Sequence, residues 1–475
     1  MGAMNTFLTI GRRDMTATRH NRRQFLQTSA RLTVTAVAAP HLVPASALGL
    51  DGTPAPSERI MMGLVGCGGH GTGWNLDRMH ANPDQQVVAV CDVDSQHAEA
   101  AEKKVNGHYS KVLKRDYRCD VHGDFRELIN RKGIDAVDVA TPDHWHVIPA
   151  LMAIKAGKHV ICEKPLSLTI SEGRVLADAA TKSGLVFQTA SENRSIDSYI
   201  HICELVHAGM IGELRHIKVL LPSGNAPRDN TDFTIMDPPA HLSYEMWQGQ
   251  APLAPYCPAR IHNTFRWNLA YSGGRLTDWG AHMIDLAQWA SGHQQTGPVE
   301  VEGKGKFPPR DAVWNTAGEF DLHYRYANGL TMHVWSEVPG IKFEGTDGWI
   351  MFRGWRGVPT ASDPDILKQT VPEEKRLHRP KTIVARNNSD RLGGGEHLDF
   401  TDCIKNGKTT YAPAEIGHRT ISISHMGNIA MLLGKKLKWN PDTEQFDNDD
   451  ANKMLTREQR EPWTIANVDS WINVG

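Results

Sequence analysis

The sequence predicts two consecutive folded domains, a doubly wound α/β domain with a parallel sheet and an α+β domain rich in strands. From Arg59 to Thr189, near-continuous apolar runs alternate with helical patterns. Parallel strands give such runs because they are buried on both faces, and repeated β-α units fold into a doubly wound sheet. After Thr189 this alternation stops, and beyond Val299 alternating apolar and polar residues flank a hairpin turn. That change predicts the second domain.

Length, charge and cysteine usage describe a globular protein. The 475 residues suffice for about two or three domains. The formal net charge is −2, and six arginines against one aspartate give residues 1–47 a charge of +5, which leaves −7 for the rest. That acidic remainder argues against a nucleic-acid partner. No apolar run is long enough to span a bilayer. The seven cysteines lie far apart without a C-x-x-C pair, so they predict neither a disulfide framework nor a zinc ribbon.

The N-terminal segment, residues 1–47, has the pattern of an export signal. Arg22-Arg23 precede a modestly apolar stretch, Leu32–Ala39, and Ala45-Ser46-Ala47 forms a small-residue cleavage site. Twin arginines before a weakly apolar core resemble a Tat signal, which predicts the Tat machinery as partner and a periplasmic or exported location. A disordered basic tail is the alternative. Residues 48–58 are predicted to be a linker.

The elements of the first domain follow in order between residues 59 and 190. Its predicted strands are Arg59–Gly66, Gln86–Val90, Ile134–Ala140, His159–Cys162 and Leu185–Thr189. Its predicted helices are Thr72–Ala81, Gln96–Val105, Asp124–Arg131, Val147–Ala156 and Thr169–Lys182. Ligands of such sheets bind beyond the carboxyl ends of the strands. The residues expected at those ends are Gly66, Asp92, Thr141, Glu163 and Lys164.

The glycine-rich stretch Gly63–Gly73 contains a G-x-G-x-x-G match that predicts a dinucleotide site. The first glycine of such a match allows a tight turn, the second lets the backbone approach a pyrophosphate, and the third lets helix and strand pack closely. Asp92 follows the match by 21 residues and ends a strand, where an acid binds the adenosine ribose of NAD and repels the 2′-phosphate of NADP. A glycine-rich turn and a helix cap are the alternatives. The predicted cofactor residues here are Gly66, Gly68, Gly69, His70, Gly71 and Asp92.

Two further motifs carry a family resemblance. Thr141-Pro142 stands three residues before the pair Trp145-His146, and Ala156–Pro165 reads AGKHVICEKP. Together with the glycine loop and the strand ending in Cys-Asp, these motifs resemble the Gfo/Idh/MocA family of NAD(P)-dependent oxidoreductases. The resemblance runs from Arg59 to about Asp450. It implies that Lys164 reaches between nicotinamide and substrate, and it extends the cofactor-binding set to Thr141, Pro142, His146, Glu163 and Lys164.

The resemblance also implies the organisation of the remaining chain. Residues 59–190 are expected to form the Rossmann NAD-binding domain. Residues 191–450 are expected to form a substrate-binding α+β domain with a large open, mainly antiparallel sheet. The flat face of that sheet commonly forms the oligomer interface in the family, so a homo-oligomer, dimer or tetramer, is expected. Residues 451–475 are expected to form a C-terminal tail.

The second domain begins with a predicted helix, Ser195–Gly209, and a strand, Leu214–Leu221. A long irregular section, Pro222–Arg266, then carries aromatic and basic side chains that suit a polyhydroxylated ligand, because ring faces stack on sugar C–H surfaces and Arg and His bind hydroxyls. Aromatic residues that fasten the loop to the core are the alternative. The predicted substrate residues are Arg194, Tyr256, Arg266, Trp267 and His397.

The stretch Gly273–Asp285 supplies the predicted catalytic residues. On a helix, Asp278, His282 and Asp285 fall at i, i+4 and i+7 and form one polar stripe among apolar neighbours. The family has a catalytic Asp-x-x-x-His at this place, which implies that His282 takes the hydroxyl proton and that Asp278 orients the imidazole or a substrate hydroxyl. A structural Asp–His hydrogen bond is the alternative. No metal site is predicted, because the pair offers two ligands and no third is recognisable from spacing.

The C-terminal half is predicted to be mainly strands and then helices. The sequence Asn328-Gly329 predicts a hairpin between two alternating segments. The predicted strands are Glu319–Tyr326, Leu330–Trp335 and Trp349–Arg353, and the predicted helices are Leu398–Lys405 and Ile416–Leu433. The resemblance implies that the region of His397 returns toward the active site.

These observations predict an exported, NAD-dependent oxidoreductase acting on a sugar or polyol. Because the space outside the cytoplasmic membrane lacks a supply of NAD, the cofactor is expected to be tightly held and to be reduced and reoxidised within one cycle. One alternative is a glycoside hydrolase or lyase that oxidises a ring hydroxyl transiently, cleaves by elimination and has no net redox change. Another is a sugar-binding protein that keeps a structural dinucleotide.

Overall fold

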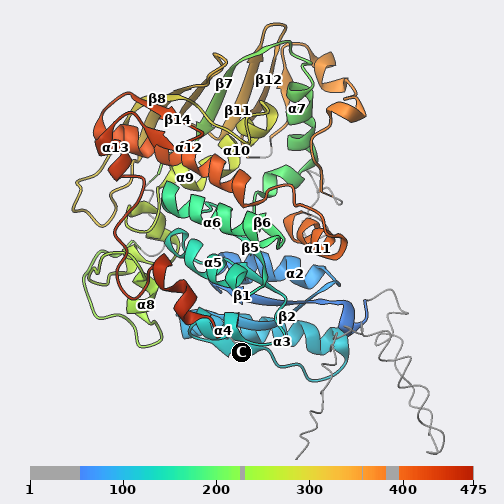
Figure 1. Ribbon diagram of the computed structural model, residues 1–475, viewed down its shortest axis with the longest axis vertical. Coiled ribbons are helices and arrows are strands. Elements are labelled where there is room, and N and C mark those ends of the chain that lie inside the picture. The colour runs from blue at the N-terminus through green and yellow to red at the C-terminus, as the bar shows by residue number, and fades with distance from the viewer. Residues whose placement is uncertain (1–53, 225–230, 356, 381–394, 474–475) are drawn as a thin grey trace, which may run out of the picture. The chain divides into compact units, whose positions relative to one another are not determined.

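The computed structural model describes residues 54–224, 231–355, 357–380 and 395–473. The predicted signal segment, residues 1–47, lies outside them. The first half forms a six-stranded parallel sheet in the order β3-β2-β1-β4-β5-β6, which confirms the doubly wound prediction (Figure 1). Its strands are β1 (Ile60–Val65), β2 (Gln85–Cys91), β3 (Asp120–His122), β4 (Ala136–Val139), β5 (His159–Cys162) and β6 (Phe187–Thr189).

Local signals set the helices of this domain. Asp94, Asp124 and Thr169 cap three of them by accepting hydrogen bonds from backbone N–H groups of the first turn. A short π-helix, Gly71–Asn75, leads from the glycine loop into the first α-helix, so the predicted helix Thr72–Ala81 has two parts. The helices are α2 (Leu76–Ala81), α3 (Ser95–Leu113), α4 (Phe125–Asn130), α5 (Val147–Lys155) and α6 (Ile170–Ser183).

The second half contains a nine-stranded sheet in the order β13-β12-β11-β7-β10-β9-β8-β14-β15. All its pairs are antiparallel except β7 with β10, which confirms the predicted, mainly antiparallel sheet. The strands on either side of Asn328-Gly329 pair as predicted. The strands are β7 (Leu214–Leu221), β8 (Glu300–Lys306), β9 (Glu319–Arg325), β10 (Thr331–Ser336), β11 (Gly340–Gly345), β12 (Trp349–Arg353), β13 (Thr360–Ala361), β14 (Leu437–Asn440) and β15 (Gln445–Phe446).

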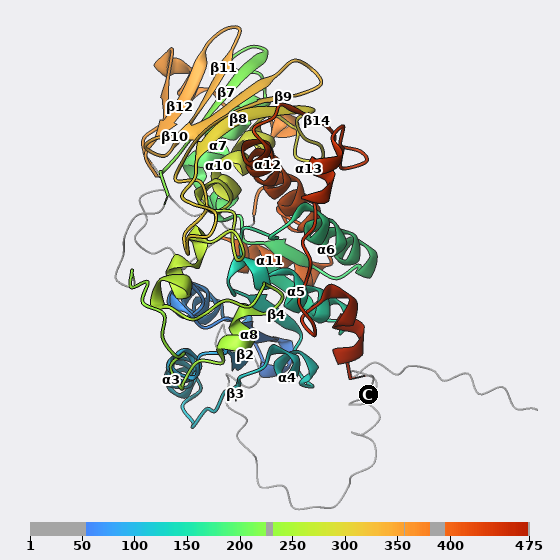
Figure 2. The same ribbon diagram turned by 90° about the vertical axis from the view of Figure 1, so that its left-hand side faces the viewer.

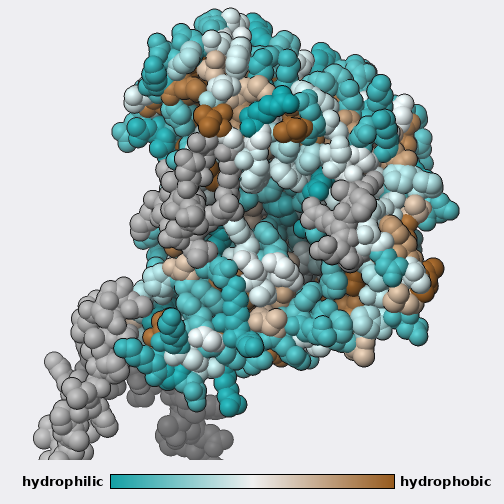
Figure 3. Space-filling view, turned by 180° about the vertical axis from the view of Figure 1, so that it is seen from behind, coloured by the Kyte–Doolittle hydropathy of each residue, from teal (hydrophilic) through white to brown (hydrophobic). Residues whose placement is uncertain are grey.

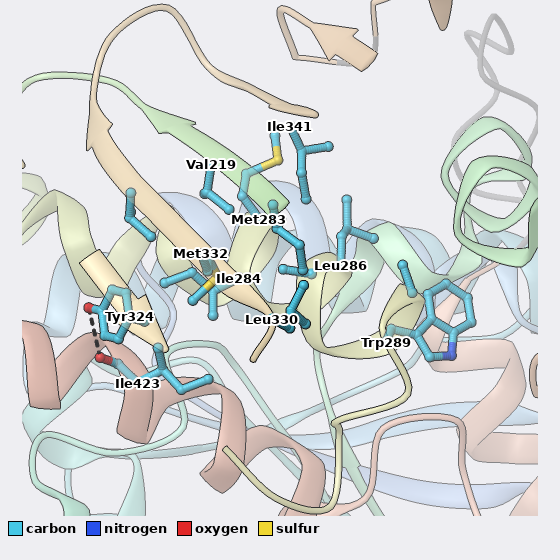
Figure 4. Packing of buried hydrophobic residues seen from close by; sticks show 14 of the residues in the cluster. Val219, Met283, Ile284, Leu286, Trp289, Tyr324, Leu330, Met332, Ile341 and Ile423 are labelled. Atoms are coloured by element: carbon cyan, nitrogen blue, oxygen red, sulfur yellow. Dashed lines mark hydrogen bonds between the residues drawn. The ribbon is translucent and has the colours of Figure 1, made fainter. Parts of the chain in front are cut away.

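Helices cover one face of this sheet and connect it to the first domain. Helices α10 and α12 lie between the two sheets, and α12 also packs against α6 (Figures 1 and 2). Figure 4 shows apolar side chains between the nine-stranded sheet and helices α10 and α12, where the Tyr324 hydroxyl donates a hydrogen bond to the Ile423 carbonyl at 3.1 Å. The helices of this half are α7 (Asp197–His207), α8 (Tyr244–Gln248), α9 (Arg275–Asp278), α10 (Gly280–Ala290), α11 (Glu396–Asn406), α12 (Ala414–Leu433) and α13 (Asp449–Lys453).

The long irregular segment after β7 is hydrogen-bonded to the first domain as well as to the second. Ser95 N–H donates to the His241 carbonyl and Ser243 N–H donates to the Val93 carbonyl, both at 2.9 Å. The Trp145 indole N–H donates to the Trp247 carbonyl at 3.0 Å. These bonds place the aromatic segment around α8 beside the carboxyl ends of the parallel strands.

The C-terminal segment, expected to be a tail from residue 451, packs onto the first domain. Helix α13 crosses the expected boundary, and Trp463 and Val468 are buried in the apolar cluster that contains Trp145 and Ile148. Among the helices that the structure describes, none combines the length and apolar composition needed to cross a membrane.

Candidate active site

The glycine loop has the backbone geometry that its three glycines predict. Gly66 adopts φ +98°, and a Cβ there would lie 2.5 Å from the Ala140 carbonyl carbon. A Cβ on Gly71 would lie 2.0 Å from the Gly66 carbonyl oxygen, so a side chain would separate strand from helix. At Gly68 and Gly69, by contrast, a Cβ would meet nothing within 4 Å. The loop is therefore tight at its ends and open at its centre.

A cavity of about 530 Å³ lies at the carboxyl ends of the parallel strands. Seen from behind, the molecule has a hollow with hydrophilic residues on its floor (Figure 3). The predicted residues that line the cavity are Gly66, Gly68, Gly69, His70, Asp92, Thr141, Pro142, His146, Glu163, Lys164 and Arg266. The long segment closes another side of the cavity with Met246, Trp247, His262, Asn263, Phe265 and Arg266. The aromatic and basic side chains of residues 222–266 were the sequence signal for this wall.

Asp92 is fixed at the cavity by the loop that it faces. Its Oδ2 accepts a hydrogen bond from Cys67 N–H at 2.7 Å, and its Oδ1 accepts one from Asp94 N–H at 2.9 Å. Nearby, the Thr141 hydroxyl is buried and has no hydrogen-bond partner among the described residues. Buried polar groups are normally paired, so this hydroxyl needs a partner that occupies the cavity.

Lys164 and Asp278 join the two domains at the same place. The Lys164 ammonium lies 2.8 Å from Asp278 Oδ1, and the Arg275 guanidinium lies 3.0 Å from Oδ2. Arg266 approaches Oδ1 at 3.5 Å. Burial alone would raise the pKa of Asp278, but Lys164, Arg266 and Arg275 outweigh it and hold this pKa well below its usual range. Asp278 is therefore a permanent carboxylate.

A second ion pair, not predicted from the sequence, links the glycine loop to the Glu163-Lys164 motif. Glu163 accepts a hydrogen bond from His70 Nε2 at 2.9 Å. Burial would raise the pKa of Glu163, yet His70 and Lys164 lower it to about 2. Burial would lower the pKa of His70, and Glu163 raises it above the ordinary value instead.

His282 is buried and is not among the residues that line the cavity. The predicted helix is divided, because α9 ends at Asp278 and α10 begins at Gly280. No hydrogen bond joins Asp278 to His282 in the described part of the chain. The imidazole packs edge-on against Trp355 with ring centres 5.0 Å apart, and its buried Nδ1 lacks a partner within the same residues. Burial, reinforced by Lys164, lowers the pKa of His282 to about 3.

The structure places two predicted substrate residues, Arg194 and His397, in the core instead of the cavity. Arg194 is 1% exposed and forms a two-pronged ion pair with Asp285, at 2.7 and 2.8 Å. His397 is also 1% exposed, and its Nε2 is hydrogen-bonded to Asp138 at 2.9 Å. A guanidinium or imidazole that already has a buried carboxylate partner is a structural group here.

Two further predicted substrate residues lie away from the cavity wall. Trp267 is buried beneath the Arg275 guanidinium, which stacks on its ring at 4.6 Å. Tyr256 packs edge-on against Tyr244 and lines a separate, shallow groove of the long segment. These two residues fit the alternative interpretation, in which aromatic rings attach the long segment to the core. Gly71 lies beneath the loop and not in the wall, in keeping with its packing role.

Family comparisons agree with this geometry. Residues 60–191 match an oxidoreductase family described by its NAD-binding Rossmann fold, and residues 202–374 and 390–465 match the C-terminal alpha/beta domain of the same family. The chain belongs to the Gfo/Idh/MocA oxidoreductase family. The Rossmann domain of this family binds NAD. The open glycine loop fits such a dinucleotide, and so do Asp92 and Thr141 in the cavity wall.

Individual Gfo/Idh/MocA relatives are distant. Levoglucosan dehydrogenase of Pseudarthrobacter phenanthrenivorans is 30% identical over 255 residues, 48% of this chain and 58% of that protein. Glycosyl hydrolase family 109 protein 2 of a Shewanella species is 30% identical over 162 residues, 34% of each chain. The matches thus span about a third to three-fifths of these relatives. A solved structure, levoglucosan dehydrogenase in complex with NADH and L-sorbose, shares the fold with a TM-score of 0.55 at 19% identity, covering 80% of this chain and 99% of that one.

Substitutions of the two arginines predicted to bind substrate are expected to change the free energy of unfolding by clearly different amounts. Replacing Arg194 with Leu is expected to lower the free energy of unfolding by about 3–5 kcal/mol, because Asp285 stays buried without its cation. Replacing Arg266, whose side chain is 26% exposed, is expected to cost less than about 1 kcal/mol. Urea denaturation followed by circular dichroism measures both. Equal losses in the two variants would contradict the structural role of Arg194.

Proposed function

We propose that the protein is a dehydrogenase that moves a hydride between a sugar or polyol hydroxyl and a tightly bound NAD. The observation that carries this proposal is the Lys164–Asp278 pair at 2.8 Å, because Lys164 lines the cavity that the glycine loop opens. A cation fixed beside a dinucleotide cavity is suited to hold the oxygen of a reacting hydroxyl. The relatives named levoglucosan dehydrogenase and inositol 2-dehydrogenase 1 support a sugar or polyol as the substrate class.

The residues present define how NAD would be held. The open centre of the loop at Gly68 and Gly69 would receive the pyrophosphate, and Asp92 and Thr141 would offer partners for hydroxyl groups of the cofactor. A carboxylate at the position of Asp92 repels a 2′-phosphate, which favours NAD over NADP. When bound, NAD supplies the hydride acceptor. The protein supplies position, charge and the proton acceptor.

Lys164 and Asp278 have distinct roles in the proposed reaction. The ammonium of Lys164 donates a hydrogen bond to the substrate oxygen and stabilises the negative charge that develops there. Asp278 holds the ammonium in place and accepts a hydrogen bond from a neighbouring hydroxyl of the substrate. Because Lys164, Arg266 and Arg275 hold the pKa of Asp278 far below its usual range, this carboxylate stays ionised beside the ammonium.

His282 is the proposed proton acceptor. Its buried imidazole is neutral at physiological pH, because its pKa is lowered to about 3. As the hydroxyl loses its hydride, the proton passes to this ring, and the carboxylates of Asp278 and Glu163 stabilise the imidazolium. A low pKa makes the protonated ring a strong acid, so the proton returns readily in the reverse direction.

We further propose an exported homo-oligomer. Twin arginines and a small-residue cleavage site support passage through the Tat system, which carries folded proteins and so allows a cofactor to be bound first. The outward face of the nine-stranded sheet, which carries exposed His323 and Arg325, is the surface we assign to the subunit contact.

A resident cofactor predicts what the purified protein releases. Denaturing the full-length chain after gel filtration is expected to release about one NAD per chain, measured by mass spectrometry of the small molecules. Gly68→Leu is expected to abolish this release by filling the open loop, whereas Gly107→Leu, on the exposed side of α3, is expected to retain it. Release of NADP would contradict the role of Asp92, and the absence of any dinucleotide would contradict tight binding.

The low pKa of His282 predicts an unusual pH profile. The single-turnover reduction of bound NAD by a subsaturating sugar or polyol is expected to show no inflection near pH 6.5, and its acid limb is expected to fall toward about pH 3. His282→Gln should lower the rate by about 10²- to 10⁴-fold. Stopped-flow nicotinamide absorbance measures both. An acid limb near pH 6.5 that disappears in the variant would contradict a buried, neutral ring.

A second candidate function is glycoside cleavage through transient oxidation, favoured by the relative named as a family 109 glycosyl hydrolase. Oxidation of a ring hydroxyl to a ketone acidifies the adjacent C–H. Loss of that proton expels the glycosidic oxygen, water adds, and the hydride returns to the carbonyl. Chromogenic glycosides added to the holoenzyme without free NAD distinguish the two functions. Aglycone release without accumulated oxidised sugar would overturn the dehydrogenase proposal.

A further inference from the structure

Three metal-ligating side chains meet at the rim of the cofactor cavity. Asp94 ends the loop after β2, His97 lies in the first turn of α3, and His262 comes from the long segment of the second domain. One ligand atom from each lies within 4.8 Å of the others, and all three residues line the cavity. The sequence predicted no metal site, because 165 residues separate His97 from His262.

The spacing in this cluster differs from that of a simple hydrogen-bonded group. His262 Nε2 and Asp94 Oδ2 are 3.7 Å apart, which is too long for a hydrogen bond. Two atoms that ligate one tetrahedral zinc at about 2.0–2.1 Å lie about 3.3 Å apart. For this pair of atoms, a shared cation requires a closure of about 0.4 Å, from 3.7 to about 3.3 Å. His262 also adopts φ +52°, a left-handed conformation that non-glycine residues seldom take and that is often found at functional sites.

A comparable group on the outer sheet face provides the contrast. Asp321, His323 and His333 also come within ligand distance of one another. There, however, His333 is hydrogen-bonded to Asp321 Oδ1 at 2.9 Å, His323 Nε2 lies 3.1 Å from the same oxygen, and the carboxylate is 47% exposed. Asp94 is 3% exposed. Because Asp94 is buried and its Oδ2 lies beyond hydrogen-bond distance of His262, this carboxylate has more to gain from a cation between them than the exposed Asp321 has.

Neighbouring residues orient the first cluster as a ligand set requires. His97 Nδ1 lies 3.7 Å from Asp92 Oδ2, the same separation as that between His262 Nε2 and Asp94 Oδ2. His241 Nδ1 lies 3.0 Å from Asp94 Oδ1 and so holds the carboxylate from the other side. Carboxylates and imidazoles that hold metal ligands in this way are a regular feature of metal sites.

We propose that Asp94, His97 and His262 bind a divalent transition metal of the zinc class, with a fourth coordination position open. The metal would join the long segment to the end of β2, across the rim of the cavity. If the proposed function holds, this bond slows the escape of NAD, since the segment must move for the adenosine half to leave. The metal site itself does not depend on that function.

The test uses the full-length, untagged chain, stripped with a chelator and loaded with Co²⁺. One cobalt per chain with the intense visible bands of tetrahedral coordination is expected. His262→Ala and Asp94→Asn should lose this spectrum, and asparagine keeps the cap of α3 so that the fold is retained. His333→Ala, the matched change in the outer cluster, should keep it.

The outcomes decide the metal site without reference to activity. Circular dichroism confirms that each variant is folded. No tetrahedral spectrum in the wild-type chain, or a spectrum lost in His333→Ala but kept in His262→Ala, would overturn the proposal. A second measurement follows NAD release after chelation, where at least a tenfold faster release is expected. If cobalt binds as described but no NAD is present, the metal site stands and the proposed function fails.

Discussion

The ion pair between Lys164 and Asp278 is the interaction on which the site depends. Lys164 follows a strand of the first domain, and Asp278 ends a helix of the second, so the pair fixes one domain against the other at the cavity. A buried carboxylate is costly unless it is paired. The guanidinium of Arg275 provides a further partner at 3.0 Å, and the resulting network keeps a charge in place where a hydroxyl would react.

Most of the fold could be predicted because its signals are local. Apolar runs marked the parallel strands, and Asn328-Gly329 marked a hairpin. The three-residue strand β3 (Asp120–His122) was missed because it is mostly exposed and too short to show a period. The chain after residue 450 resembled a tail because its apolar residues, such as Trp463, are scattered among charged ones.

The site could be predicted only where a residue's place in the fold determines its role. Glycines at a strand-to-helix turn and an acid at a strand end are of this kind. Arg194 and His397 are not, because a basic side chain suits a sugar and a buried carboxylate equally well. Only the folded chain reveals that Asp285 and Asp138 are their partners. The same limit hid the pairing of His70 with Glu163, which are 93 residues apart.

Asp278 and His282 thus lie close together in opposite electrostatic environments. Around Asp278, three cations keep a carboxylate ionised, whereas burial keeps the neighbouring His282 neutral. In the proposed reaction the hydroxyl oxygen loses a proton while its carbon loses a hydride, so a cation beside the oxygen and an unprotonated imidazole both serve the reaction. Exchanging the two environments would give a protonated acid and a charged imidazole, neither of which accepts a proton. The division of helix α9 from α10 between these residues lets each side chain keep its own surroundings.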